Sequence, residues 1–260
     1  MSVRFAVLIC GLLLSPLLSA QPTQSPQASA TSSLSDQWRF SVTPYAWGMG
    51  IRGSISQNGT SLGEVKLSTG DVLSDLKMAA MLVVEARRGR YGIYLDGMYG
   101  DLGTSASRVV GRADLTANTR LAMTMLTVAP TFNIQSSPSL QLDGLVGARV
   151  MWQNAKTTIS LPQSGQSVSE SSNLQLAAGI AGVKGRYNFE NSKYFVPFYL
   201  DVGAGQSSSF TSQAYLGVGR TFDWGDVSLV AKNVYYQLKP NQNTVDLNMF
   251  GAAIAATFRF

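Results

Sequence analysis

The sequence predicts an all-β fold: a closed antiparallel transmembrane β-barrel of about ten strands, within a range of about eight to twelve. Three observations predict it. The C-terminal segment alternates between apolar and small or polar residues, the N-terminus reads as a secretory signal, and short turns alternate with long connections along the chain. A short helical turn is expected in the first external loop.

The C-terminal segment, residues 246–260, gives the clearest alternation. Every second residue back from the terminus is apolar: Phe260, Phe258, Ala256, Ile254, Ala252 and Phe250. The opposite face carries Arg259 and Thr257 among small residues. Because a strand directs its side chains alternately to two faces, one face suits lipid and the other a tight interior. Phe250, Phe258 and Phe260 resemble the assembly signal of outer-membrane barrels, which the barrel-assembly machinery would recognise.

The N-terminus has the features of a secretory signal peptide, predicted as residues 1–20. Arg4 precedes an apolar run from Phe5 to Leu18, and Ala20 is the expected cleavage position. An uncleaved anchor helix is the alternative, but the run is shorter than the ~20 residues that span a bilayer. Residues 21–36, rich in Gln, Ser, Thr and Pro, are expected to be a disordered periplasmic leader. Residues 37–260 remain for the barrel.

The composition excludes several functions. The 20 Lys and Arg and the 15 Asp and Glu are scattered, so no basic cluster predicts nucleic-acid binding. The chain has no histidine, and its one cysteine, Cys10, lies in the predicted signal peptide. The processed chain would therefore have no disulfide, no thiol nucleophile and no Cys-ligated metal. We expect no cofactor, no metal and no enzymatic activity.

The apolar–polar alternation predicts the barrel strands in chain order. They fall at residues 38–50, 77–88, 91–103, 118–135, 139–156, 173–189, 194–206, 210–223, 226–238 and 246–260. Short turns are expected at residues 88–90, 136–138, 190–193 and 223–226. Longer loops are expected at residues 51–76, 104–117, 157–172 and 239–245. An even number of strands with both termini in the periplasm places every short turn on the periplasmic side.

Aromatic residues cluster near both predicted ends of the strands. Trp38, Tyr91 and Trp224 lie near the periplasmic ends, and Tyr99 and Trp152 near the outer ends. Two such girdles are expected where amphipathic rings meet the membrane interfaces. Ordinary core aromatics of a soluble β-sandwich are the alternative interpretation.

The first loop combines a hairpin and a helical turn. Asn58-Gly59 is a strong two-residue hairpin signal, which predicts a ribbon that rises beyond the membrane. Residues 71–76 then predict one helical turn with Asp71 as its N-cap. This turn would either cover the hairpin, which we favour, or fold into the barrel mouth as a plug.

The inward faces of the predicted strands carry charges of both signs. The expected lumen network comprises Arg39, Glu85, Arg87, Asp96, Asp143, Arg149, Lys184, Asp201 and Arg259. Glu85 and Asp96 would be diagonal neighbours across a hairpin, which is the remaining arrangement for proton chemistry. We favour a charge ladder instead, because charges in a narrow lumen must be paired or hydrated. A barrel of this size leaves at most a narrow pore.

One stretch of the chain resembles a known family. Residues 38–102 are similar to a largely uncharacterised family of Gram-negative, proteobacterial outer-membrane β-barrels. The likeness is carried by Pro44-Tyr45-Ala46-Trp47, residues 71–76 and residues 85–99. The resemblance implies a barrel fold and the cell outer membrane, and it brings no settled activity.

Two functions are expected from the sequence. The first is a monomeric structural membrane protein or a narrow passive channel for water, ions or very small solutes. The second is a surface-exposed adhesin or ligand-binding barrel that acts through loops 51–76, 104–117 and 157–172. The expected partners are outer-membrane lipid, lipopolysaccharide and, during biogenesis, the assembly machinery, with no nucleic acid.

Overall fold

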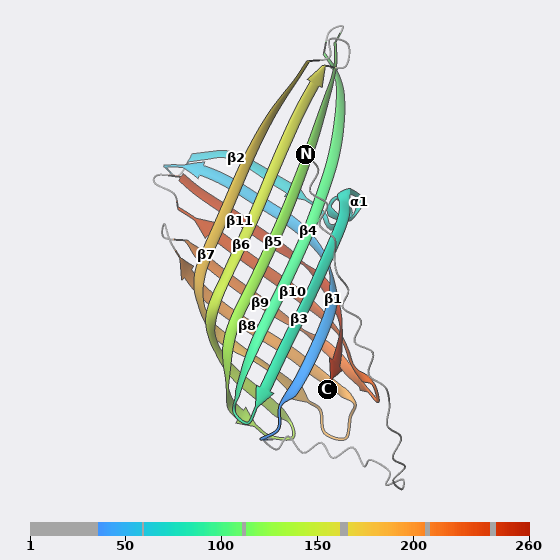
Figure 1. Cartoon of the computed structure of the whole chain (residues 1–260), viewed down its shortest axis with the longest axis vertical. Coiled ribbons are helices and arrows are strands. Elements are labelled where there is room, and N and C mark those ends of the chain that lie inside the picture. Colours follow the sequence, from blue (N-terminus) through green and yellow to red (C-terminus); the bar gives the residue numbers. More distant parts are fainter. Residues whose placement is uncertain (1–35, 59, 111–112, 162–165, 206–208, 240–242) are drawn as a thin grey trace, which may run out of the picture. The chain divides into compact units, whose positions relative to one another are not determined.

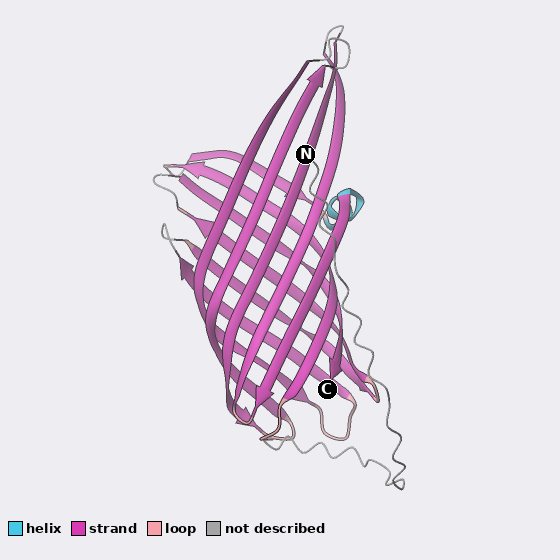
Figure 2. Ribbon diagram, in the orientation of Figure 1, coloured by secondary structure: helices cyan, strands magenta, loops and turns pink. Residues whose placement is uncertain are grey.

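The computed structural model describes residues 36–58, 60–110, 113–161, 166–205, 209–239 and 243–260. The predicted signal peptide and nearly all of the leader lie outside these residues. The described part is almost entirely strand (Figure 2). Its elements are β1 (Arg39–Gln57), β2 (Thr60–Leu67), α1 (Thr69–Asp75), β3 (Leu76–Arg88), β4 (Tyr91–Val110), β5 (Ala113–Ser136), β6 (Leu140–Leu161), β7 (Gln166–Asn188), β8 (Tyr194–Gly205), β9 (Phe210–Phe222), β10 (Gly225–Leu238) and β11 (Asn243–Arg259).

The strands form one closed antiparallel sheet (Figure 1). From β3 to β11, each strand pairs with the next one along the chain, and β1 pairs with both β3 and β11. Among the described residues, β2 pairs with β1 alone and lies outside the ring of ten strands. The prediction of a closed antiparallel barrel is therefore confirmed.

The ring closes between its first and last strands. The β1–β11 ladder runs from Ser41↔Arg259 to Gln57↔Asn243. Below it, Phe40 and Phe260 exchange two backbone hydrogen bonds, at 3.1 and 2.9 Å. The terminal residue thus contributes directly to closure, and a closed sheet leaves fewer polar backbone edges facing lipid.

Two predicted loops are wrong. Residues 104–117 and 157–172 are mostly strand: β4 and β5 pair as far as Val110↔Ala113, and β6 and β7 as far as Leu161↔Gln166. The Ser- and Thr-rich composition of these segments favoured loops, because it lacks the apolar face of a lipid-contacting strand. Antiparallel pairing satisfies their backbone groups without that face.

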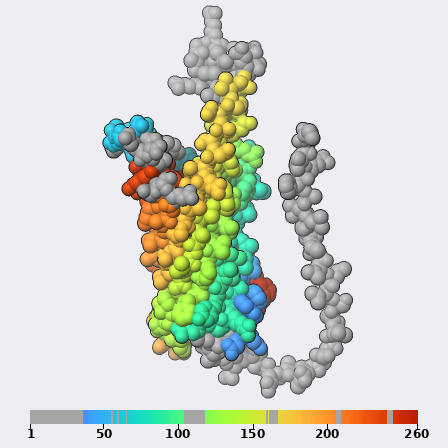
Figure 3. All heavy atoms as spheres, turned by 60° about the vertical axis from the view of Figure 1, so that its left-hand side comes forward, coloured from blue at the N-terminus to red at the C-terminus, as the bar shows by residue number. Residues whose placement is uncertain are grey.

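The upper parts of β4 to β7 extend beyond the neighbouring strands. Pairing of β3 with β4 stops at Leu76↔Leu102, and pairing of β7 with β8 stops at Ala178↔Gly205. Beyond these points the four strands continue as a sheet of their own, visible as the tall green and yellow segments in Figures 1 and 3. We call this part the projecting sheet: residues 103–110 of β4, 113–120 of β5, 154–161 of β6 and 166–177 of β7.

The segment between β1 and β3 holds the predicted hairpin and helix. The hairpin predicted within residues 51–76 is confirmed, because β1 continues to Gln57 and β2 returns antiparallel to it. Asn58 adopts a φ of +49°, as a tight hairpin turn requires. The N-cap of α1 is Ser68 rather than Asp71, because Asp71 sits three residues into the helix and completes a capping box with Ser68. The hydrogen bonds from Ser68 lower the pKa of Asp71.

The two faces of the barrel wall differ as a membrane barrel requires. The outward face is apolar, with Leu200, Leu216 and Val218 each more than half exposed. The inward face holds the buried residues, both polar and apolar. Hydrocarbon would cover the outward rows, since no second sheet covers them among the described residues. No helix in the described part of the chain is long and apolar enough to cross a membrane.

Candidate functional site

The middle of the lumen holds a buried ion pair. Arg149 on β6 donates bidentately to Asp201 on β8, with Nη1 2.9 Å from Oδ1 and Nη2 bonded to Oδ2. Both side chains have zero exposure. Arg149 also donates to the hydroxyl oxygens of Thr127 at 3.1 Å and Thr211 at 3.3 Å, and the Tyr199 hydroxyl donates to Asp201 at 2.5 Å. Such dense bonding compensates for burying two charges.

A second buried carboxylate lies beside this pair. Asp96 on β4 accepts hydrogen bonds from the Tyr45 hydroxyl at 2.8 Å and from Lys232 Nζ at 3.2 Å. It also accepts from the Tyr94 hydroxyl at 3.4 Å and from Gln213 Nε2 at 3.5 Å. Asp96 and Lys232 are 1% and 4% exposed, so this ion pair is also out of water.

These two groups together span the lumen. Gln213 on β9 reaches Asp96 on β4, and these strands are opposite each other in the ring. The Tyr94 ring lies 5.6 Å from the Tyr199 ring, which stacks on Tyr215 at 5.3 Å. We call this layer the waist: Tyr45, Tyr94, Asp96, Thr127, Arg149, Tyr199, Asp201, Thr211, Gln213, Tyr215 and Lys232. This layer of inward side chains lies between the charged and the apolar parts of the lumen.

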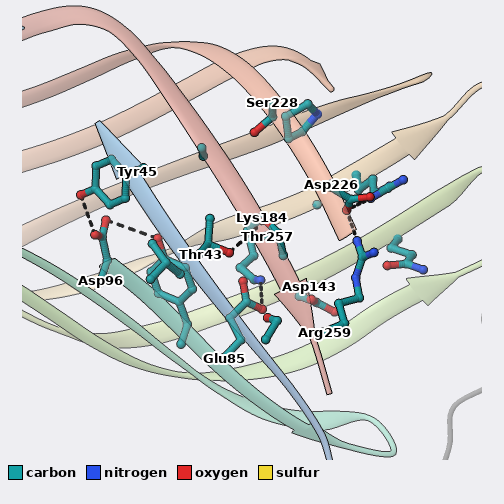
Figure 4. Close-up of a pocket in the computed structure, with 18 of the residues that line it drawn as sticks. Thr43, Tyr45, Glu85, Asp96, Asp143, Lys184, Asp226, Ser228, Thr257 and Arg259 are labelled. Atoms are coloured by element: carbon teal, nitrogen blue, oxygen red, sulfur yellow. Dashed lines mark hydrogen bonds and ion pairs between the residues drawn. The ribbon is translucent and has the colours of Figure 1, made fainter. Parts of the chain in front are cut away.

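Below the waist, toward the short turns, the lumen holds a charged chamber of about 440 Å³ (Figure 4). Lys184 Nζ lies 2.5 Å from Glu85 Oε2, and Arg87 pairs with Asp143. Asp226 accepts from Arg186 at 2.5 Å and from Arg259. We call this space the lower chamber, and charges of both signs line it throughout.

The structure brings the predicted lumen residues together in this way. Arg149, Asp201 and Asp96 lie in the waist, while Glu85, Arg87, Asp143, Lys184 and Arg259 form ion pairs around the lower chamber and Arg39 lines it. Glu85 and Asp96 do not form an acid pair, because each is matched with its own lysine. Sequence reasoning missed Asp226, Lys232 and Gln213. The alternation along β9 and β10 places all three side chains on the inward face, and this pattern could have identified them from the sequence.

Above the waist the lumen is apolar and rich in methionine. Met98, Met125, Met151 and Met249 are at most 2% exposed and pack in one cluster with other apolar residues of the inner wall. The sequence analysis did not single out these methionines. They occupy inward positions on β4, β5, β6 and β11, so the same period-two pattern that identified the inward charges was sufficient to identify these methionines.

The other predicted residues lie on the outward face. Trp38, Tyr91 and Trp224 are 56%, 70% and 52% exposed near the short turns. Tyr99 and Trp152 are half-buried and lie on the same row, since both pair with Thr124. The three residues of the predicted assembly signal, Phe250, Phe258 and Phe260, are 60%, 38% and 76% exposed.

No group of three or more His, Cys, Asp or Glu side chains that could hold a metal occurs in the described ranges. The carboxylates of the lumen are held by Arg and Lys instead. Chemically, the site offers matched ion pairs and an apolar space rather than a metal ligand set.

The comparisons with known proteins agree at the level of fold. No protein-family model and no curated protein matches the chain. The outer-membrane protease OmpT of Escherichia coli has a TM-score of 0.58 and 8% identity, over 89% of this chain and 100% of its own. The translocator domain of the autotransporter NalP of Neisseria meningitidis has a TM-score of 0.41 and 14% identity, over 86% of this chain and 88% of its own.

The fold-level argument rests on OmpT. At 8% identity the likeness extends to architecture and not to activity. Together with the apolar outward rows, it gives the chain the fold of Gram-negative outer-membrane β-barrels and places it in the outer membrane.

Proposed function

We propose that the protein is a structural outer-membrane β-barrel whose lumen is closed to solutes at the waist. The observation that carries this proposal is the buried Arg149–Asp201 pair, together with the tyrosine layer that joins opposite walls. An open diffusion pore keeps a hydrated path along its lumen, whereas here buried side chains separate the lower chamber from the apolar upper half. We propose that the barrel is not an open porin.

Planar-bilayer recordings test this proposal. The purified wild-type protein is expected to give a flat trace at high potential. A waist variant, Arg149→Ala combined with Tyr199→Ala, should give conductance steps, because both substitutions remove volume from the blocking layer. Lys193→Ala is the matched control, since the Lys193 side chain is 66% exposed and belongs to a turn outside the waist.

Two outcomes contradict the proposal. Steady conductance of the wild-type protein means that the lumen is open. A flat trace from a folded waist variant means that the barrier lies elsewhere in the chain. Heat-modifiable gel mobility establishes that each variant is folded.

A surface-binding role is the second candidate, and the projecting sheet favours it. Within the described residues, strand pairing leaves β4 without a neighbour on one side beyond Leu102, and β7 without one before Ala178. Free strand edges bind extended peptides by adding a strand. Ser169, Glu170 and Ser171 on β7 are exposed and polar, which keeps that edge soluble.

Shortening the projecting sheet tests the surface-binding role. Residues 107–116 are replaced by Asn-Gly, because Ala106 and Ala117 are paired and a two-residue turn closes that register. A binder loses adherence to its target cells while the barrel still assembles. Unchanged adherence of cells that carry the shortened barrel contradicts the surface-binding role.

We further propose that the barrel is not an enzyme. The chain has no histidine to serve as a general base, and the two candidate acids are each matched with a lysine. Glu85→Gln separates the alternatives: an activity that this variant abolishes without loss of fold would contradict the proposal. We propose a monomer whose partners are outer-membrane lipid, lipopolysaccharide and the assembly machinery.

A further inference from the structure

The wall of the barrel has a gap in its hydrogen-bonded ladder between β1 and β3. The two strands pair from Arg39↔Arg87 only as far as Pro44↔Leu82. On the same side, β1 next pairs with β2 at Ile51↔Leu67. Residues 45–50 of β1 and 76–81 of β3, all described, therefore do not pair with each other. Pro44 stands where the ladder stops, and a proline has no N–H with which to continue one.

The short helix α1 covers this gap. It leads directly into β3 and packs mainly against β1, as Figures 1 and 2 show at the upper end of β3. The Thr69 hydroxyl lies 3.4 Å from the Gly48 carbonyl oxygen, and a Cβ at Gly48 would lie 3.3 Å from Thr69 Cγ2. Val72 is 3% exposed and belongs to the apolar cluster of the upper lumen. The helix thus packs mainly against β1, with Val72 directed into the apolar cluster, and forms part of the wall beside the gap.

An apolar cavity of about 580 Å³ lies at the gap. Its lining carries no ionisable group except the Tyr45 hydroxyl at its lower end, where it meets the waist. The inward side chains that line it are Trp47, Met49, Ile51, Met81, Met98, Leu102 and Met123. Val72, Leu73 and Leu76 complete the lining from α1 and the start of β3. We call this space the upper chamber.

The upper chamber reaches both faces of the wall. Ala46 and Trp47 are consecutive on β1, so their side chains point to opposite faces, yet both line the chamber. Leu229 and Ile254 also line it, and they lie on the outward face with 54% and 55% exposure. A cavity lined from both faces passes through the wall, and on the outward side it meets hydrocarbon.

We propose that the upper chamber is a binding site for a small uncharged apolar molecule that enters from the bilayer through the gap beneath α1. The absence of charge in the lining selects against ions, because an unpaired charge would be desolvated there. A dry apolar cavity of about 150 Å³ binds benzene, and ligand pockets span roughly 300–1,000 Å³. Methionine side chains adapt to ligands of irregular shape.

One polar atom sets a further preference. Trp47 is 5% exposed, and its Nε1 has no hydrogen-bond partner among the described residues. An indole nitrogen can only donate, so a ligand with a single acceptor oxygen would satisfy it. The ligand class is therefore a hydrocarbon-like molecule, aromatic or aliphatic, with at most one uncharged acceptor group. This binding site is a further property of the proposed barrel, and binding there does not require any solute to pass through the waist.

Fluorescence quenching of Trp47 tests the proposal. In a full-length variant that carries Trp38→Phe, Trp152→Phe and Trp224→Phe, Trp47 is the remaining tryptophan. The protein is placed in vesicles of unbrominated phosphatidylcholine, and 4-bromotoluene is the probe. We expect 4-bromotoluene to quench Trp47, and we expect 4-bromobenzenesulfonate, the same ring with a charge, to leave it unquenched. A companion variant that retains only the exposed Trp224 reports probe in the membrane.

A reversible lock tests the route. Gly48→Cys with Thr69→Cys places two thiols at the contact between β1 and α1, where a Cβ added at Gly48 would lie 3.3 Å from Thr69 Cγ2. Cys10 is the one other cysteine of the chain, and a Cys10→Ser substitution removes it from this variant. The oxidised variant should lose Trp47 quenching, and dithiothreitol should restore it in the same sample.

Two results overturn the proposal. If 4-bromotoluene quenches the Trp224 companion but not Trp47, the chamber takes no apolar molecule. If the oxidised variant is quenched as strongly as the reduced one, the molecule does not enter beneath α1. Because oxidised and reduced samples are one polypeptide, a folding defect cannot imitate the second result.

Discussion

Arg149→Met is expected to destabilise the barrel far more than loss of a surface ion pair does. Arg149 has zero side-chain exposure and bonds to Asp201, Thr127 and Thr211. Methionine fills similar volume but leaves the Asp201 carboxylate buried with the Tyr199 hydroxyl as its remaining partner among these contacts. Breaking one partner of a buried pair costs about 3–5 kcal/mol, so we expect about 4 kcal/mol in the free energy of unfolding.

Equilibrium urea unfolding in phospholipid vesicles, followed by tryptophan fluorescence, measures this loss. Lys193→Met is the matched control, because Lys193 and Asp223 lie 3.9 Å apart with 66% and 104% side-chain exposure, and such pairs contribute about 0–1 kcal/mol. Adding Asp201→Asn to Arg149→Met removes the orphaned charge and should recover about half of the loss. Equal effects of Arg149→Met and Lys193→Met would refute the assignment of the waist as a desolvated layer.

Three further predictions follow from local contacts. Ser68→Ala should remove the N-cap of α1 at a cost of about 1 kcal/mol and raise the rate of Trp47 quenching about fivefold; an unchanged rate argues that the helix ends do not control opening. Acidification should also raise the rate of Trp47 quenching. The pKa of Asp71 is lowered in the helix, so the ionised Asp71 stabilises α1 near neutral pH, and this stabilisation is lost as the pH falls through the lowered pKa. Measuring the quenching rate at stepped pH values below about 4 tests this. Gly251→Ala should block assembly, because a Cβ there would lie 1.9 Å from the Gly48 carbonyl oxygen, whereas Gly100→Ala meets no atom within 4 Å; heat-modifiable mobility compares the two.

The barrel could be predicted because each strand that contacts lipid carries an apolar residue at every second position, and this pattern recurs along the chain. Phe250, Ile254 and Phe258 occupy alternate positions, and the same alternation recurs on the other strands that cross hydrocarbon. Where this alternation is absent, the sequence analysis predicted loops in place of strands. The segments 104–117 and 157–172 are rich in Ser and Thr and have no apolar alternation, so the strand pairing of their described residues left no periodic signal.

The sequence predicted which charged side chains point into the lumen, but it did not predict which of them form ion pairs with each other. Register places Asp96, Arg149 and Asp201 inward, as the alternation predicts. Which cation meets which carboxylate depends on how the strands stagger across the ring, and period-two patterns carry no information on this. Asp96 therefore meets Lys232, which lies four strands away around the ring, rather than a neighbour in its own hairpin.

The gap in the wall depends on the same stagger. The ladder between β1 and β3 ends at Pro44, β1 next pairs with β2, and α1 is the short connection that returns the chain to β3. A capping box at Ser68 holds that connection helical although seven residues are too few for a stable isolated helix. In the proposed barrel, the waist separates the lumen into a charged and an apolar compartment, and the weakly held helix lies over the apolar one. Under these proposals, apolar molecules reach the upper chamber from lipid, and the lower chamber opens only toward the periplasm. The barrel would then connect the membrane interior with the upper chamber without connecting the two sides of the membrane.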